Sequence, residues 1–462
     1  MEAPLKAPPA NQTLSFSFAG TAYKFGIDLV MTSTSHGLIT RFDDNGTGSG
    51  TIDSQTSGVA QSALTGSYAF ALNGTDTSFN ALGNVGTFTL DANGNATGVE
   101  DFNDGGDSSA GLTNQALESG STVLVGSSGA AGTSQLASSA FGVLGFDVWV
   151  IDATHLKLIE TDATGLLLAG DAYVSTGQSF PSGNLVFTMS GIDDSATPGP
   201  PIAIGGVFST ASSPNTSGTE SINDAGSVAQ APSFGVSFST TGARTLLTLS
   251  SIYNGGWGVS STSSTGTYTF AAYPYTYGTS GAGVVLLEVD SLGGESAGSA
   301  YLQSSTSFAT GQGYGLNLSG VNETAEGEVD MIAEFTVPSS GTNVTGLYDA
   351  NFAGTTAFDY NLDPSTSSPS TYSFSSGSGT MQFPSLQEPS SDPLPALNLT
   401  FFSIDGSNVA FIETDSDQVA SGTFQLQNAS GSSADAAALP HFAMVHPSPK
   451  AAAAKRSLKK QQ

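Results

Sequence analysis

Three carboxylate pairs of the form Glu-x-Asp are the residues of this sequence best suited to acid–base chemistry. On a strand, residues two apart share one face about 6.5–7 Å apart, which suits paired catalytic acids or shared cation binding. The alternative is structural, with the acids ending a strand and hydrogen-bonding the adjacent turn. Because duplicated folding signals are expected and duplicated catalytic pairs are uncommon, we favour the structural role. The pairs are Glu160/Asp162, Glu288/Asp290 and Glu413/Asp415.

A serine pentapeptide, Gly294-Glu-Ser296-Ala-Gly298, matches the G-x-S-x-G pattern of an esterase nucleophile elbow. The elbow needs a strand before the serine, a helix after it and a histidine later in the chain. Here the pentapeptide occupies a turn position of the repeat described below, and a short strand follows it. The only later histidines are His441 and His446, near the C-terminus. We therefore predict no catalytic residue in this chain.

The segment Asp91-Ala-Asn93-Gly-Asn95 resembles the start of a calcium-binding loop. The positions that an EF-hand fills with glycine and glutamate hold Ala96 and Phe102, so we predict a hairpin turn instead. The acids that follow could hold a divalent cation weakly, or they could form a solvated loop. They are Glu100, Asp101, Asp104 and Asp107, and no cofactor is expected.

Aromatic residues could form a platform on which sugars stack, although most aromatics on alternating strands belong to the core. The candidates are Trp149, Trp257, Tyr268, Tyr273, Tyr275 and Tyr277. The four histidines show no metal-ligand spacing. Two of them, His36 and His155, precede corresponding strands, and we interpret them as turn residues.

The carboxylate pairs belong to a long internal repeat. Leu156–Asp162, Val284–Asp290 and Val409–Asp415 share one pattern, and Leu38–Asp43 is a fourth copy with Arg41 in place of glutamate. The four aspartates are 119, 128 and 125 positions apart. A Gly-x4-Asn motif also recurs in order, ending at Asn103, Asn223 and Asn351. Self-similarity at a fixed period indicates a repeat architecture.

Each full repeat holds about eight short alternating apolar runs separated by Gly, Asn, Asp and Ser turns. The pattern predicts an all-β protein of tandem small antiparallel β-barrels or β-sandwiches, about 120–128 residues each, and serial hairpins favour the barrel. The predicted segments are an irregular lead (1–13), a partial repeat with the rear portion only (14–55), three full repeats (64–178, 182–305 and 311–428) and a low-complexity tail with a basic end (430–462).

The partial repeat poses a physical problem, because four strands cannot close a barrel and an open sheet leaves edges unpaired. Either an upstream half is absent from this sequence, or strands 14–53 dock on the repeat at 64–178. We favour the first, since the initial MEAPLKAPPANQ has no apolar signal-peptide region.

The chain carries 39 acidic and 10 basic residues, and five of the basic residues lie in the last 13 positions. Such an acidic body disfavours nucleic acid and anionic lipid as partners. The absence of cysteine excludes disulfides, thiolate zinc sites and cysteine nucleophiles. No run of 18 apolar residues occurs, so we predict no transmembrane helix.

The sequence resembles a group of poorly characterised, exported, glycine- and serine-rich β-repeat proteins of soil bacteria, often found with Ig-like modules. The matching segments are Leu64–Phe70, Gly86–Asn95, Asp101–Gly105 and the Ile-Glu-x-Asp strands, within about 14–428. The resemblance implies secretion or surface attachment and no particular activity.

Three functions follow as expectations. The favoured one is a non-enzymatic, extracytoplasmic surface, matrix or adhesion protein, located outside the cell or on its surface. The second is a ligand- or glycan-binding barrel array, and the third an ester or glycoside hydrolase. The partner would be a glycan or another surface protein.

Overall fold

The computed structural model describes residues 12–18, 21–43, 46–175, 177, 179–192, 200–211, 215–253, 265–278, 281–290, 294–322, 327–352, 354–362, 368–384 and 396–427. The predicted tail and nearly all of the predicted lead lie outside these ranges. Within them, strands are the only regular elements apart from one 3-10 turn, η1 (Gln61–Leu64). The all-β prediction is confirmed.

A four-stranded antiparallel sheet, here called the leading sheet, begins the described chain. Alternation in the sequence around Leu38 produces its strands, since every second side chain faces the same side. Its strands, in hydrogen-bonded order, are β1 (Gln12–Phe18), β2 (Thr21–Met31), β3 (His36–Arg41) and β4 (Ser49–Asp53).

The first module is a nine-stranded sheet in which the first strand, β5, pairs with the last, β13. This pairing curls the sheet into an open barrel. Its strands are β5 (Gly66–Thr75), β6 (Ala81–Leu90), β7 (Ala96–Asp104), β8 (Gln115–Ala116), β9 (Thr122–Val125), β10 (Ala131–Ser138), β11 (Gly142–Asp152), β12 (His155–Glu160) and β13 (Leu167–Val174).

The second module is a closed barrel, because β14 pairs with both β15 and β21. Its strands run as a meander, as the serial hairpins predict. They are β14 (Asn184–Ile192), β15 (Pro201–Ser209), β16 (Asn215–Asp224), β17 (Ser227–Thr241), β18 (Arg244–Tyr253), β19 (Thr265–Tyr277), β20 (Gly281–Glu288) and β21 (Glu295–Leu302).

The third module repeats the nine-stranded arrangement of the first, with β22 paired to both β23 and β30. Its strands are β22 (Gln312–Asn322), β23 (Gly327–Val337), β24 (Thr345–Phe352), β25 (Thr355–Asn361), β26 (Thr371–Ser375), β27 (Ser378–Phe383), β28 (Leu397–Ser403), β29 (Asn408–Glu413) and β30 (Gln418–Leu426).

Each module encloses its own apolar core. In the second module, inward side chains such as Leu185, Phe187 and Met189 alternate along β14 and are fully buried. The first and third modules have equivalent cores, built around Phe70 and Phe411 respectively.

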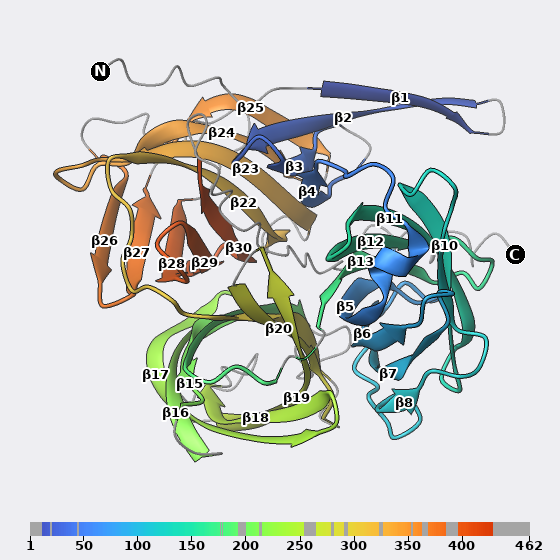
Figure 1. Cartoon of the computed structure of the whole chain (residues 1–462). Helices are drawn as coiled ribbons and strands as arrows, with labels where there is room; N and C mark the ends of the chain where they lie inside the picture. The colour runs from blue at the N-terminus through green and yellow to red at the C-terminus, as the bar shows by residue number, and fades with distance from the viewer. Residues whose placement is uncertain are drawn as a thin grey trace, which may run out of the picture.

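The modules also pack on one another through the outer faces of their sheets (Figure 1). We call the outer side of β6–β7, β15–β16 and β23–β24 the front face, and the outer side of β2–β4, β11–β13, β19–β21 and β28–β30 the rear face. The front face of the first module meets the rear face of the second, and the front face of the second meets the rear face of the third.

The leading sheet docks on the front face of the third module, where Val30 and Leu38 pack against Ile332. Sequence reasoning had offered the repeat at 64–178 as its alternative docking surface. The leading sheet docks on the third module because β2–β4 present a rear face. The front face of the third module is the one that no other module covers.

Candidate functional site

The three Glu-x-Asp pairs occupy corresponding strand ends. Glu160, Glu288 and Glu413 are the last residues of β12, β20 and β29. Each following aspartate accepts a hydrogen bond from a backbone N–H on the neighbouring strand. The donors are Gly145 to Asp162 at 2.6 Å, Thr269 to Asp290 at 2.8 Å and Asn398 to Asp415 at 3.2 Å. This geometry ties each turn to its sheet.

The glutamates of these pairs are buried. Burial, with Asp162 adding to it, raises the pKa of Glu160 to about 7. Burial and the proximity of Asp415 raise the pKa of Glu413 well above its ordinary range. Glu160 and Glu413 therefore favour the protonated form more than a free side chain does.

Ser296 lies inside strand β21, paired with Gly191, rather than in the turn that the sequence suggests. It is buried and its hydroxyl donates a hydrogen bond to Glu288. The described histidines, His36 and His155, belong to the leading sheet and the first module. Among the described residues, the pentapeptide thus has neither the following helix nor the nearby histidine of a nucleophile elbow.

The recurring asparagines make the joints between modules. The side-chain amide of Asn103 donates to the carbonyls of Glu288 and Gly294 at 3.1 and 2.9 Å. Asn223 donates to the carbonyls of Asp415 and Gln418 at 2.9 and 2.8 Å. In each joint the asparagine of one module satisfies carbonyls in the Glu-x-Asp turn of the next.

The third joint repeats the arrangement with the leading sheet. Asn351 donates to the carbonyls of Arg41, Asp43 and Gly46 at 3.0, 3.0 and 2.8 Å. Each asparagine oxygen also accepts from a glycine N–H three residues later in its own turn, for example Gly354 at 2.8 Å. The Gly-x4-Asn motif and the Glu-x-Asp motif are therefore two halves of one docking contact.

The four acids considered for a cation site do not converge. Glu100 accepts from Asn84, and burial raises its pKa to about 7. Asp101, on the opposite face of β7, forms a bidentate pair with Arg244 of the second module at 2.6 and 2.9 Å. Asp104 and Asp107 bond through their backbones in a turn. No group of three or more His, Cys, Asp or Glu side chains suited to a metal ion occurs in the described part of the chain.

The segment at Asp91 is a hairpin turn between β6 and β7. The carboxylate of Asp91 accepts from the backbone N–H groups of Asn93 and Asn95 at 2.8 and 2.9 Å. Gly94 has a φ of +83°, a conformation that favours glycine. The Asp91 side chain thus stabilises the turn.

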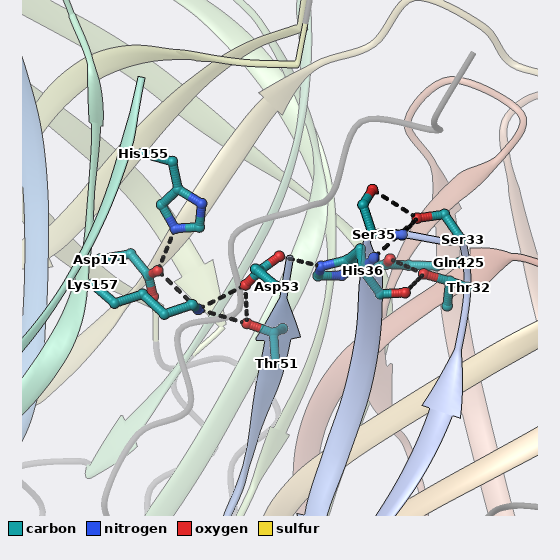
Figure 2. Close-up of polar contacts among 10 residues, drawn as sticks. All are labelled: Thr32, Ser33, Ser35, His36, Thr51, Asp53, His155, Lys157, Asp171 and Gln425. Atoms are coloured by element: carbon teal, nitrogen blue, oxygen red, sulfur yellow. Dashed lines mark hydrogen bonds and ion pairs between the residues drawn. The ribbon is translucent and has the colours of Figure 1, made fainter. Parts of the chain in front are cut away.

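A chain of charged groups joins the leading sheet to the first module (Figure 2). The ammonium of Lys157 lies 3.0 Å from Asp53 and 3.1 Å from Asp171. His36 contacts Asp53 at 2.7 Å, and His155 contacts Asp171 at 2.6 Å. The sequence suggested only turn positions for the two histidines, because nothing in it shows that a lysine from another sheet lies between their aspartates.

The charges in this chain stabilise one another. Burial alone would raise the pKa of Asp53, but the hydrogen bond from His36 and the charge of Lys157 lower it well below its ordinary value. Burial raises the pKa of Asp171, but Lys157 and His155 together outweigh it and lower the pKa. The pKa of Lys157 is raised by Asp171 and Asp53 despite burial. The arrangement is an ionic junction between the leading sheet and the first module.

The aromatic side chains considered for a stacking platform lie in different parts of the molecule. Tyr268, Tyr273, Tyr275 and Tyr277 are buried, and the last three belong to the apolar contact between modules. Trp149 is partly exposed on the rear face of the first module, and Trp257 lies outside the described residues. These side chains therefore form no shared stacking platform.

An open groove lies between the second and third modules, where two adjoining cavities of about 320 and 380 Å³ share Thr219, Ser378 and Phe402. One wall is the outer face of β15–β17 and the other is formed by β26–β28. Hydroxyl and amide side chains dominate its lining, among them Ser217, Ser233, Gln230, Gln303, Ser373 and Thr380.

The groove combines a polar wall with aromatic rings. Ser373 and Thr380 share a hydrogen bond of 2.9 Å at its edge, and Phe374 and Phe402 line its apolar part. None of the described residues that line it is a lysine, an arginine or a histidine. Neutral polar ligands therefore suit it better than anions. The sequence contains only a weak signal for it, namely the Ser- and Thr-rich outward positions of β16 and β26.

Comparisons with known proteins add little. No protein-family model and no curated protein matches the chain. Among solved structures, it is similar to a transferrin binding protein B double mutant from Haemophilus parasuis, with 8% identity over 91% of this chain and 86% of that chain, at a TM-score of 0.22. It is also similar to the isotype 1 transferrin binding protein B of serogroup B Neisseria meningitidis, with 8% identity over 85% and 84% of the two chains and a TM-score of 0.22.

A third structure, kievitone hydratase from Nectria haematococca, shares 10% identity over 54% of this chain and 90% of that chain, with a TM-score of 0.17. Likeness at this level has no bearing on function. In the described part of the chain, no helix is long and apolar enough to cross a membrane.

Proposed function

We propose that this chain is a non-enzymatic binding protein of the cell surface or exterior, and that the groove between its second and third modules binds a neutral glycan. The groove is the observation on which this proposal rests. Its paired cavities are large enough for a short oligosaccharide, since ligand sites commonly measure about 300–1,000 Å³.

The chemistry of the lining supports a sugar over other ligands. Serine and threonine hydroxyls and glutamine amides both donate and accept hydrogen bonds, as sugar hydroxyls do. The Phe374 ring offers apolar surface to the C–H face of a pyranose. An acidic body with a net charge of −29 would repel sulfated or sialylated glycans.

The closed barrel itself offers no comparable space, because inward side chains such as Phe187, Phe208 and Phe270 fill it. A surface or adhesion role, favoured by composition and resemblance, is compatible with glycan binding and would be its setting.

The test is a glycan array probed with the intact chain, followed by calorimetry with the strongest neutral hit. Ser378→Trp places a large ring in both cavities and should weaken binding at least tenfold, because it fills the space that the sugar would occupy. Thr97→Trp, on the exposed face of β7 in the first module, is the matched control and should bind as the wild type does. Equal binding by both variants, or binding only to anionic glycans, would contradict the proposal.

A further inference from the structure

The rear face of the first module is a second candidate interaction surface, and it repeats a face that is covered everywhere else. In the second and third modules and in the leading sheet, the rear face packs on a front face. The first module presents the same strands, β11–β13, yet all three front faces in the chain are already in use. The end near Lys157 is covered by Thr51 and Asp53 of β4, and Tyr173 on β13 packs on Tyr275 of the second module.

Residue exposure shows the difference at corresponding positions. Strand register aligns Ile159, Leu167 and Trp149 of the first module with Ile412, Val419 and Phe402 of the third. The first three are 43%, 61% and 41% exposed, whereas the second three are 0%, 1% and 4% exposed. Val143, on the same face, is also exposed. We call this group, Val143, Trp149, Ile159 and Leu167, the open face.

The covered joints show what an occupant must offer. Ile412 packs with Ala203 and approaches Gly205 so closely that a Cβ there would lie 3.0 Å from it. Leu287 of the second module packs on Gly83 in the same way, where a Cβ would lie 2.5 Å away. The front faces of the first and second modules thus supply a small residue opposite the large apolar side chain, and an asparagine that reaches the Glu-x-Asp turn.

The turn beside the open face lacks that asparagine. Asn103, Asn223 and Asn351 all donate to other turns, as described above. The carbonyl groups of residues 160–166 therefore receive no asparagine side chain from any module in the described part of the chain. The first module therefore presents only one half of a joint. Its exposed apolar side chains and its Glu-x-Asp turn have no front face and no joint asparagine opposite them in the described chain.

We propose that the open face of the first module docks the front face of a module of the same kind carried by another polypeptide. A second copy of this chain in the same conformation has no front face to offer, because its leading sheet and its rear faces cover all three. The partner would be a β-hairpin surface with small outward residues at the positions of Ala203 and Gly205, and an asparagine at the position of Asn223. A contact of this type is heterologous, joining two different surfaces.

The test uses the full chain as acceptor and a full-length variant as probe. Leu38→Asp in the probe places a charge in the contact with Ile332 and releases the leading sheet from the third module, which exposes the front face around Asn351. Strand register places Asp330 and Ile332 where the second module has Ala203 and Gly205, so Asp330→Ala and Ile332→Gly in the same probe supply the small residues. Ile159→Asp in the same probe prevents it from binding itself. Biolayer interferometry should then show concentration-dependent binding of this probe to wild-type chain.

Two matched variants locate the contact. Ile159→Asp in the acceptor, or Asn351→Ala added to the probe, should reduce binding at least tenfold. Leu124→Asp in the acceptor, an exposed apolar residue on β9 outside the open face, should leave it unchanged. Val30→Asp replaces Leu38→Asp if the latter loses the far-UV circular dichroism of the wild type. A folded probe that fails to bind at about 100 µM, or one that binds the Ile159→Asp acceptor equally well, would overturn the proposal.

Discussion

At the scale of single residues, the recurring asparagines make the hydrogen bonds that join one module to the next. Asn223 is fully buried, and its amide reaches carbonyls of both Asp415 and Gln418 from the neighbouring module. A buried carbonyl that loses its donor keeps the cost of having left water, which is typically about 1–3 kcal/mol.

Asn223→Ala is therefore expected to lower the free energy of unfolding by about 1–3 kcal/mol, because several carbonyls lose one donor together. Urea denaturation followed by intrinsic fluorescence would measure it. Asn93→Ala, in the exposed turn between β6 and β7, is the control and should change stability by less than about 0.5 kcal/mol. Similar values for the two variants would show that the joint asparagine contributes no more than a surface residue.

At the scale of elements, the contact between the leading sheet and the third module contains several buried acids. Asp28 and Asp349 are both fully buried and interact with each other. Burial, with the neighbouring carboxyl, raises the pKa of Asp349 to about 9, and burial raises the pKa of Asp28. Burial beside Glu328 raises the pKa of Asp330 to about 8. The protonated form of these carboxyl groups therefore stabilises the contact between the leading sheet and the third module.

The sign of the pH effect follows from these shifts. A carboxyl whose pKa is raised in the folded state binds more protons there than when unfolded, so its contribution is complete below about pH 4 and declines as pH rises toward 8–9. The decline is at most about 1.4 kcal/mol per pH unit and per group. Hydrogen exchange at residues 26–41 should accelerate between pH 6 and pH 9 beyond the intrinsic base-catalysed increase.

Asp349→Asn removes one titrating carboxyl and leaves a donor for Asp28, so the variant should keep its leading sheet docked at pH 9 better than the wild type. Asp147→Asn, on an exposed position of β11, serves as control and should follow the wild type. An Asp349→Asn profile that tracks the wild type across this range would exclude the carboxyl pair as the cause.

The strands are easier to predict from the sequence than the contacts between modules. Strict alternation at Leu185, Phe187 and Met189 predicts a strand with one buried face, and the structure confirms the all-β class and the barrel. The continuous apolar run Val284–Leu287 held a further signal, since a strand buried on both faces needs no polar positions. The asparagines were visible as a motif, but their partners lie about 190 residues away, and no local pattern specifies such a pairing.

At the scale of the whole molecule, Lys157 is the charged link between the leading sheet and the first module. Its removal would leave the Asp53 and Asp171 carboxylates buried without a lysine charge beside them. Breaking a buried ion pair commonly costs about 3–5 kcal/mol, and the partial exposure of Lys157 reduces this to about 2 kcal/mol.

Lys157→Met is thus expected to lower stability by about 2 kcal/mol at pH 7 and to speed hydrogen exchange in residues 49–60. Because the pKa values of both aspartates are depressed, the stabilising effect is present above their ordinary pKa and is lost as pH falls through the lowered values. The difference from wild type should shrink below about pH 4. Lys157→Arg keeps the charge and should retain most of the stability; a deficit equal to that of Lys157→Met would point to packing instead.

The position of the leading sheet has a consequence for biosynthesis. Its strands end at Asp53, but the surface that buries them is complete only at Phe352, at the end of β24. At a translation rate of about 5–20 residues per second, on the order of 15–60 s separate the two on the ribosome. During that interval Val30 and Leu38 have no apolar surface to cover them, so the nascent chain would rely on a chaperone or on transient self-contact until the last barrel emerges.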